Sequence, residues 1–182
     1  MARRPRDTEA GLFHVWAHSV WSAELFADDL DRARGVSEMA RATHRQRWVC
    51  VAACLMTNHY HLLLEVPDDA LPLGMQELNF RYAAGYNARH GLRGHVFAGR
   101  YGSRRVETQA DLLDTYRYVV RNPVRAGLCS RPEDWRWSSY AGAIGQAETF
   151  TFVDAGRIVD HFGDPRDAAI ARLRLFVDEG FA

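Results

Sequence analysis

The chain has 182 residues, enough for one domain with its own apolar core, and 47% of them are hydrophobic, as is usual for a globular protein. No run of about 18 apolar residues occurs, so we expect no membrane-spanning helix. The basic N-terminal residues are not followed by an apolar stretch. We therefore expect no secretory signal and a cytoplasmic location.

The charge is balanced overall but unevenly distributed. The chain has 23 basic and 23 acidic residues, and every basic one is arginine. A net charge of zero argues against a nucleic-acid partner, but the distribution of charge matters more than the sum. Residues 78–106 contain no acidic side chain and hold six arginines: Arg81, Arg89, Arg93, Arg100, Arg104 and Arg105.

Aromatic residues, among them Tyr86, are interleaved with these arginines. Arginine side chains suit phosphate oxygens, and flat rings stack on unpaired bases. The six arginines and Tyr86 are therefore predicted to bind single-stranded nucleic acid. The alternative, a solvated face whose rings belong to the core, fits any one of these residues taken singly.

Three cysteines, Cys50, Cys54 and Cys129, occur in a chain with no export signal. Disulfide bonds are therefore not expected. Cys50 and Cys54 lie in an apolar run, and we expect them to share one face of a strand as small core residues rather than metal ligands.

The hydrophobic pattern predicts alternating strands and helices. In chain order we expect a strand over residues 14–21, a helix over 22–46, strands over 48–56 and 59–66, a helix over 73–90, a strand over 95–106, a helix over 109–121, extended packing through 135–140 and a final helix from about residue 165.

This order, β-α-β-β-α-β followed by helices, predicts an α+β fold of the ferredoxin-like, split βαβ type. Its four-stranded antiparallel sheet would carry two helices on one face, with the other face free for a site. We expect residues 1–150 to form the main domain and residues 151–182 to form a C-terminal helical extension packed on it.

The strongest candidate for chemistry is the pair His59 and His61 in the strand over residues 59–66. Alternate strand residues share a face, which places the two imidazoles about 7 Å apart at their backbones, where they can converge on one divalent ion. The alternative is two partly exposed histidines, because the H-x-H pattern also arises by chance. Glu65 shares their face, either at the edge of the site or at a solvated strand end.

Tyr118 and Asn122 share one face of the helix expected over residues 109–121 and its end. A phenol and an amide oxygen there offer a nucleophile and a third metal ligand, and mixed nitrogen and oxygen ligation suits magnesium or manganese. Asn122 precedes Pro123, so it also fits an N-cap. Tyr116 is the rival nucleophile, but its neighbour four residues on is Val120, which offers no ligand.

Four motifs in a fixed order resemble the single-tyrosine HUH transposases, and the REP-associated tyrosine transposases fit best. The first, MTNHYHLLL, is similar to the family signature M-P-N-H-Y-H-L-L. The four motifs are residues 56–64 (MTNHYHLLL), 94–101 (GHVFAGRY), 121–128 (RNPVRAGL) and 137–140 (WSSY), within a similarity over roughly residues 14–140. Thr57 replaces the usual proline, and His18 stands where an arginine is expected. Both departures concern substrate preference more than activity.

The resemblance implies that His59 and His61 bind the metal, Tyr118 is the nucleophile and Asn122 supplies the third ligand. It implies an endonuclease and strand transferase for DNA transposition and recombination. The substrate would be single-stranded DNA associated with a hairpin, and the intermediate a 5′-phosphotyrosine. A monomer acting on the DNA of a bacterial nucleoid is implied, with a homodimer as the alternative.

Two other functions remain as alternatives. One is a catalytically silent hairpin-binding protein descended from a transposase, against which the intact His59, His61 and Tyr118 argue. The other is a metallohydrolase that uses the two histidines with a water nucleophile. The common β-lactamase-like site needs an Asp-His pair two residues further on, where this chain has Leu63-Leu64.

Overall fold

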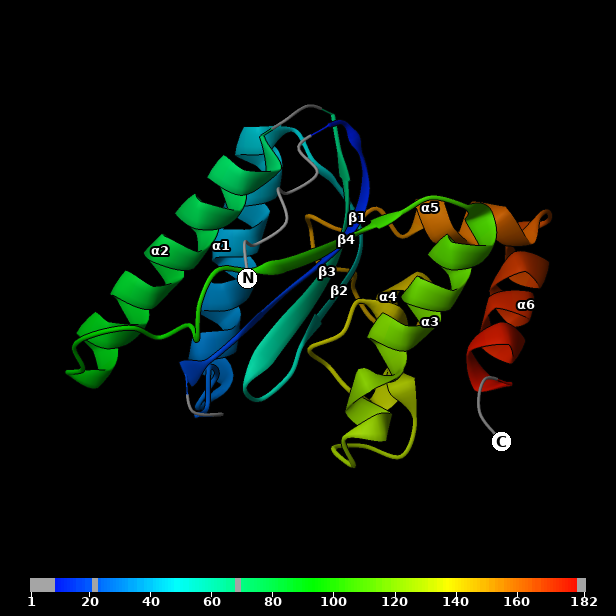
Figure 1. Cartoon of the computed structure of the whole chain (residues 1–182). Coiled ribbons are helices and arrows are strands. Elements are labelled where there is room, and N and C mark those ends of the chain that lie inside the picture. The colour runs from blue at the N-terminus through cyan, green and yellow to red at the C-terminus, as the bar shows by residue number, and fades with distance from the viewer. Residues whose placement is uncertain (1–8, 21–22, 68–69, 180–182) are drawn as a thin grey trace, which may run out of the picture.

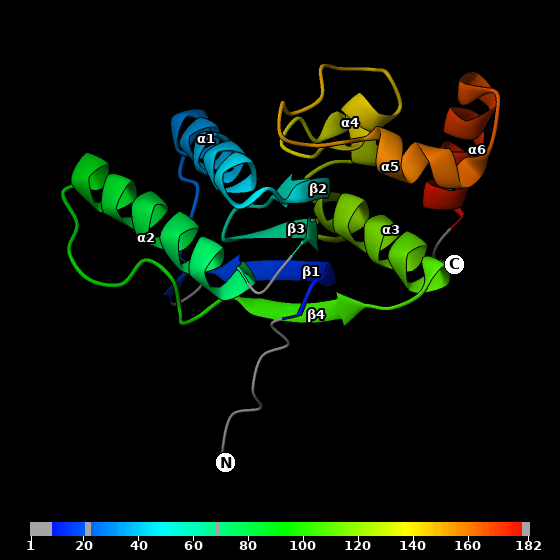
Figure 2. The same ribbon diagram turned by 90° about the horizontal axis from the view of Figure 1, so that it is seen from above.

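The computed structural model describes residues 9–20, 23–67 and 70–179. Four strands form one antiparallel sheet in the order β2-β3-β1-β4. They are β1 (Gly11–His18), β2 (Val49–Leu55), β3 (His59–Val66) and β4 (Gly102–Val106). Helices α1 (Asp29–Gln46) and α2 (Leu71–His90) lie on one face, and α3 (Gln109–Arg125) lies on the other (Figures 1 and 2). The predicted ferredoxin-like α+β fold is confirmed.

Strand alternation gives the two faces of the sheet separate apolar cores. On the face beneath α1 and α2, the buried strand residues are Phe13, Val15 and Ala17 of β1 and Tyr60, Leu62 and Leu64 of β3. On the opposite face, Leu63 packs in a second cluster with Tyr116, Val119 and Val120 of α3. The side chains of one strand thus enter two different cores according to their parity.

The C-terminal elements complete the second core. They are α4 (Tyr140–Ala143), α5 (Gly156–Val159) and α6 (Arg166–Asp178), with 3-10 turns at Pro132–Asp134 and Asp160–Phe162. Ile158, Leu173 and Val177 are fully buried in the same cluster as the inner side of α3. The prediction that the second face is free is therefore only partly correct. Helix α3 and these C-terminal helices cover the β2 side of that face (Figure 2).

Ser138 pairs with Cys54 along the outer edge of β2. The extended packing predicted over residues 135–140 is correct only in part, because residues 136–137 form a turn and α4 begins at Tyr140. The backbone N–H of Leu55 donates to the carbonyl of Trp137, and that of Ser139 donates to the carbonyl of Ala53, both at 2.9 Å. These bonds occupy backbone groups that an edge strand would otherwise leave unpaired.

Helix α1 begins later than the apolar pattern predicts. Asp28 is its N-cap, because its side chain accepts a hydrogen bond of 3.0 Å from the backbone N–H of Asp31. Leu25 and Phe26 precede the cap and are buried as part of the connection from β1. The predicted helix start at residue 22 is therefore wrong, and residue 22 itself lies outside the described residues.

Helix α3 continues through Pro123 to Arg125, so the predicted end at residue 121 is wrong. A proline lacks the backbone N–H and so removes one helical hydrogen bond. Near the end of a helix, most of the other backbone hydrogen bonds remain intact. The backbone N–H of Ala126 still donates to the carbonyl of Asn122 at 2.9 Å.

The fourth strand is shorter than predicted, Gly102–Val106 rather than residues 95–106. Gly91 and Gly94 adopt positive φ values of 65° and 99°, which turn the chain after α2. The segment after them pairs only briefly with the end of β1, where the N–H of Ala98 donates to the carbonyl of His18 at 3.0 Å. Strand β1 itself spans Gly11–His18, and the predicted end at Trp21 lies outside the described residues.

A β-bulge between Cys50 and Ala52 shifts the register of β2 against β3. Cys50 therefore enters the core beneath α1 and α2, whereas Cys54 enters the second core. The prediction that the two cysteines share a face is wrong, although both are buried core residues. Burial raises the pKa of both thiols. Within the described part of the chain, no helix combines the length and apolarity needed to cross a bilayer.

Candidate active site

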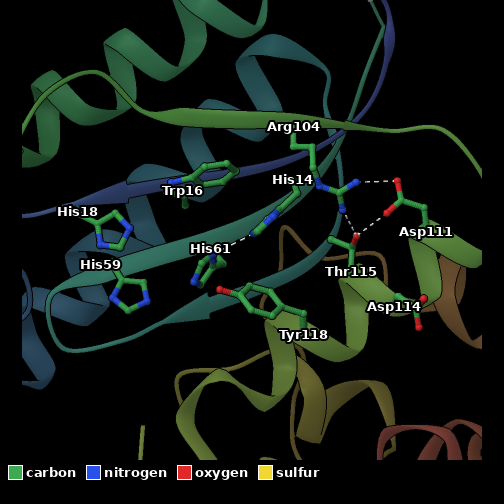
Figure 3. Close-up of a pocket in the computed structure, with 10 residues that line it drawn as sticks. All are labelled: His14, Trp16, His18, His59, His61, Arg104, Asp111, Asp114, Thr115 and Tyr118. Carbon is green, nitrogen blue, oxygen red and sulfur yellow. Dashed lines mark hydrogen bonds and ion pairs between the residues drawn. The ribbon is translucent and has the colours of Figure 1, made fainter. Parts of the chain in front are cut away.

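A cleft of about 420 Å³ opens where the second face of the sheet is left uncovered, between β1, β3, β4 and α3 (Figure 3). Histidines from two strands form its floor, and polar side chains of α3 and β4 form its wall. The lining residues are His14, Trp16, His18, His59, His61, Arg104, Asp111, Asp114, Thr115 and Tyr118.

His59 and His61 both line the cleft, with ring centroids 4.9 Å apart and ring planes nearly perpendicular. The Nδ1 atom of His59 lies 2.7 Å from the side-chain oxygen of Asn58. An amide oxygen only accepts hydrogen bonds, so Nδ1 of His59 carries the proton and its Nε2 keeps a lone pair. The geometry thus presents one nitrogen of His59 as a ligand.

His61 is buried, and its Nδ1 atom lies 2.9 Å from Nε2 of His14 on the neighbouring strand β1. Its other nitrogen, Nε2, is also buried and has no hydrogen-bond partner among the described residues. A buried polar atom without a partner is uncommon in proteins and points to a ligand-binding or other functional role. An imidazole nitrogen is a good donor to a divalent metal, so the atom fits a metal ligand.

The imidazoles of His14, His59 and His61 stay neutral near pH 7. Burial, together with a smaller contribution from the neighbouring histidines, lowers the pKa of His61 to about 2. Burial lowers the pKa of His14 to about 4, with a contribution from the Arg104 guanidinium, and lowers that of His59 to about 4, with a contribution from His18. Neutral imidazoles keep the lone pairs that metal binding requires.

Tyr118 of α3 is 39% exposed and lines the cleft. Its ring lies edge-on to His61, with centroids 5.6 Å apart, and to His14, with centroids 5.8 Å apart. Figure 3 shows its hydroxyl group directed toward His61. Helix α3 therefore brings the predicted nucleophile to the predicted histidine pair.

Tyr116 points the other way, because residues two apart on a helix lie on nearly opposite sides. Its side chain is fully buried in the second core, and its hydroxyl has no partner among the described residues. Burial raises its pKa. The side chain cannot reach the cleft from this position, so the geometry favours Tyr118 over its rival.

Asn122 does not line the cleft in this structure. Its side-chain nitrogen donates to the backbone carbonyl of Tyr118 at 3.0 Å, a bond that leaves the amide oxygen unused. No group of three or more His, Cys, Asp or Glu side chains is arranged to hold a metal ion in residues 9–20, 23–67 and 70–179. A third side-chain ligand to a cation held by His59 and His61 would have to come from another kind of group, such as the Asn122 amide.

The wall of the cleft contains a cation next to His14. Arg104 of β4 forms an ion pair of 2.8 Å with Asp111 and donates a hydrogen bond of 2.6 Å to the hydroxyl of Thr115. Trp16 lies between this wall and His18, flat against β4, where a Cβ atom on Gly102 would come within 2.3 Å of its ring. Glycine at position 102 thus makes room for an aromatic ring in the cleft.

The predicted DNA-binding residues fall into separate places. Arg104 lines the cleft, and Arg93 and Arg100 are exposed in the segment after α2. Arg81 pairs with Glu38 of α1 at 3.0 Å. Arg105 points to the opposite face of the sheet, where it lies over the Phe13 ring. The unbroken basic stretch therefore does not form one continuous surface.

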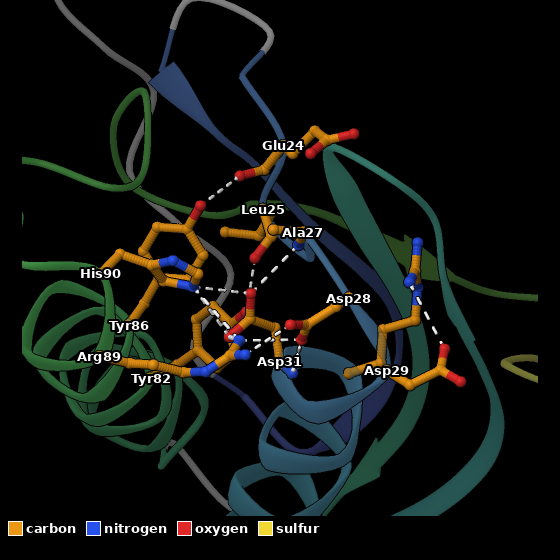
Figure 4. Close-up of polar contacts among 11 residues, drawn as sticks. Glu24, Leu25, Ala27, Asp28, Asp29, Asp31, Tyr82, Tyr86, Arg89 and His90 are labelled. Carbon is orange, nitrogen blue, oxygen red and sulfur yellow. Dashed lines mark hydrogen bonds and ion pairs between the residues drawn. The ribbon is translucent and has the colours of Figure 1, made fainter.

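Arg89 and Tyr86 belong to a polar cluster between α1 and α2 (Figure 4). Arg89 pairs with Asp28 and with Asp31, whose side chain is only 1% exposed. His90 also contacts Asp31, at 2.9 Å, and the Tyr86 hydroxyl donates to the carbonyl of Glu24 at 2.9 Å. These contacts link the start of α1 to the end of α2.

Sequence reasoning missed His14 and Trp16 as site residues. They alternate along β1 with the buried apolar residues Phe13, Val15 and Ala17, which places them on the cleft face together with His18. That alternation was available in the sequence. The contact between His14 and His61 was not, because it depends on the register between β1 and β3.

No family model matches the chain. A Haemophilus influenzae protein assigned as a REP-associated tyrosine transposase is 24% identical in an alignment of 101 residues, and the match covers 50% of this chain and 57% of that protein. The chain thus matches just over half the length of this relative.

Solved structures share the fold. A REP-associated tyrosine transposase bound to a REP hairpin superposes with a TM-score of 0.65 at 15% identity, over 92% of this chain and 90% of that one. The tRNA(His) guanylyltransferase of Saccharomyces cerevisiae superposes with a TM-score of 0.50 at 9% identity, over 93% of this chain and 74% of that one. The chain therefore resembles REP-associated tyrosine transposases in sequence and has the fold of a solved one.

Proposed function

We propose that this chain is a tyrosine transposase that cuts and rejoins single-stranded DNA beside a hairpin, with Tyr118 as the nucleophile. The observation that carries the proposal is the meeting of Tyr118 from α3 with His59 and His61 from β3 in one cleft. The solved relative is bound to a REP hairpin, which supports a DNA hairpin as the partner of this chain.

His59 and His61 would hold a divalent cation, magnesium or manganese, through their Nε2 atoms. Asn122 would supply the third ligand once its side chain turns into the cleft, since the amide oxygen is not used by its present hydrogen bond. Such an ion would polarise a nonbridging phosphate oxygen and stabilise the leaving 3′-oxygen.

The covalent step would belong to Tyr118. Its oxygen attacks the phosphorus of the DNA backbone, the bond from phosphorus to the 3′-oxygen breaks, and a 3′-hydroxyl and a 5′-phosphotyrosine result. Arg125 lies over the Tyr118 ring, 5.3 Å from its centroid, as a cation beside the group that becomes negative when it loses its proton. The ester keeps the phosphodiester energy, so a 3′-hydroxyl can attack it and rejoin the strands without ATP.

The surroundings of the cleft suit an unpaired strand. Trp16 offers an aromatic face between His18 and Arg104, and Arg100 lies exposed next to Trp16 in a small adjoining cavity of about 170 Å³. Stacking on aromatic rings combined with cationic contacts to phosphate is the usual way of holding single strands without base pairing.

The test is incubation of the protein with a labelled single-stranded hairpin that carries its natural flanks, with Mn²⁺ or with EDTA, followed by a denaturing gel. A protease-sensitive protein–DNA adduct that requires the cation is expected. Hairpin binding without an adduct would identify the catalytically silent binder instead. Cleaved DNA with no covalent protein would identify a water nucleophile and overturn the role of Tyr118.

A further inference from the structure

The two histidines that would hold the metal each have one ring nitrogen engaged by another side chain. Nδ1 of His59 bonds to the Asn58 amide oxygen at 2.7 Å, and Nδ1 of His61 bonds to Nε2 of His14 at 2.9 Å. In both cases Nε2 is left as the nitrogen that can bind a cation. His14 thus engages the Nδ1 atom of His61 in the same way that Asn58 engages the Nδ1 atom of His59.

The position of His14 is set by the sheet. It lies on β1 opposite Leu63 of β3, so it reaches His61 diagonally across the strand pair rather than directly. The planes of the two rings are inclined by 27° and their centroids are 5.1 Å apart, as for two imidazoles joined end to end by a hydrogen bond. His14 is 7% exposed and His61 is 3% exposed, so the hydrogen bond between them is shielded from competing water.

A neutral imidazole carries a single ring proton, so the bond between His14 and His61 has two arrangements. In one, Nδ1–H of His61 donates to His14, and Nε2 of His61 keeps its lone pair. In the other, His14 donates, and Nε2 of His61 carries a proton that is buried without an acceptor in the described structure. A buried N–H without an acceptor is the less favourable of the two.

We propose that His14 is a positioning residue that accepts the Nδ1–H of His61 and thereby fixes its tautomer and ring orientation, so that the Nε2 lone pair faces the cation. The inference rests on the proposed function, which makes His61 a metal ligand. Metal-binding histidines commonly donate their second N–H to a neighbouring group, often a carboxylate. A neutral histidine fulfils this role without placing a negative charge beside a site that has to accept phosphate.

The first test is the tautomer of His61 in the metal-free chain, read from long-range ¹H–¹⁵N correlations of the imidazole rings. A proton on Nδ1 and an unprotonated Nε2 are expected in the wild-type chain. A proton on Nε2 would overturn the inference. This readout does not depend on activity or on any variant.

The second test is Mn²⁺ affinity, measured by electron paramagnetic resonance on the wild-type chain and on His14→Phe and His14→Gln. Loss of the acceptor in His14→Phe should weaken Mn²⁺ binding by about 10–100-fold, the usual effect of removing such a supporting group. His14→Gln keeps an acceptor oxygen and should recover most of the affinity. His44→Phe, an exposed histidine on α1, should bind Mn²⁺ as the wild type does.

Unchanged Mn²⁺ affinity in a folded His14→Phe protein would overturn the role of His14 but leave the proposed function standing. If the wild-type chain itself binds no Mn²⁺, the metal assignment of the proposed function is wrong as well. Thermal unfolding of each variant shows whether a lost affinity reflects a lost fold.

Discussion

The two faces of the sheet are built from the same strands but have different tasks. Beneath α1 and α2, β1 and β3 present only apolar side chains and Tyr60, all buried. On the other face the same strands present His14, Trp16, His59 and His61 to an open cleft. A polar residue substituted into the first face would lack a partner, whereas the second face is only partly covered and tolerates imidazoles. In this molecule, the parity of a residue along β1 or β3 therefore decides whether its side chain stabilises the core or lines the cleft.

The largest effect is expected from the two tyrosines of α3, which repeat this division within one helix. Tyr118→Phe should abolish the covalent adduct on hairpin DNA without changing the unfolding temperature, because the hydroxyl lies in the cleft. Tyr116→Phe should leave adduct formation intact. It removes a buried hydroxyl without a partner among the described residues, so its free energy of unfolding should change by less than about 1 kcal/mol. An adduct that survives in Tyr118→Phe but not in Tyr116→Phe would reverse the assignment.

A neighbouring pair on β3 tests the two faces directly. His61→Ala should reduce DNA cleavage by more than about 100-fold, because removing a metal ligand should cost more activity than removing the group that supports it. The affinity for the hairpin should stay nearly unchanged. Leu62→Ala, which alters a side chain that is 1% exposed in the other core, should lower the free energy of unfolding by about 2–5 kcal/mol. Cleavage per folded Leu62→Ala molecule should stay close to wild type. Equal losses of cleavage in both variants would show that the faces are not separable.

The helix-covered face depends on one buried carboxylate. Asp31→Ala should lower the free energy of unfolding by about 3 kcal/mol, because Arg89 and His90 lose their shared partner. Asp29→Ala is the matched control, since this carboxylate is 62% exposed and its ion pairs should contribute less than about 1 kcal/mol. Chemical denaturation measures both. A similar stability in the two variants would mean that the cluster around Asp31 does not hold α1 to α2.

Much of the fold follows from local sequence signals. Strand β3 was predicted with its observed bounds, because an apolar run with histidines in alternation defines both its type and its faces. The start of α1 was wrong because Leu25 and Phe26 continue the apolar spacing although they lie before the cap at Asp28. The extent of β4 was wrong because a segment rich in glycine and arginine carries no alternation to read.

The candidate site could be predicted only in part, because its contacts cross the chain. Spacing identified His59, His61 and Tyr118, but nothing local joins His14 to His61. The bulge that separates Cys50 from Cys54 has no glycine to mark it. The DNA-binding arginines were the hardest residues to predict. The sequence of a basic stretch does not show whether an arginine within it faces solvent or, like Arg81, pairs with an acidic residue of another helix.

The arginines give the smallest effect, in the salt dependence of DNA binding. Each phosphate contact to a single strand contributes about 0.7 to the slope of log affinity against log salt concentration. Arg100→Ala should reduce the slope by about that amount, because Arg100 is exposed beside Trp16 and makes no ion pair within the described residues. Arg81→Ala should leave the slope unchanged, because its guanidinium pairs with Glu38 in the helix layer, away from the cleft.

Hairpin binding titrations at several salt concentrations measure both slopes. If Arg81→Ala and Arg100→Ala reduce the slope equally, DNA runs over the α1 and α2 layer as well as the cleft, and the division between the two faces fails for binding. If only Arg100→Ala reduces it, the strand is confined to the face that carries Tyr118. The position of the bound strand then follows from where strand parity places the histidines, and not from where the sequence concentrates its charge.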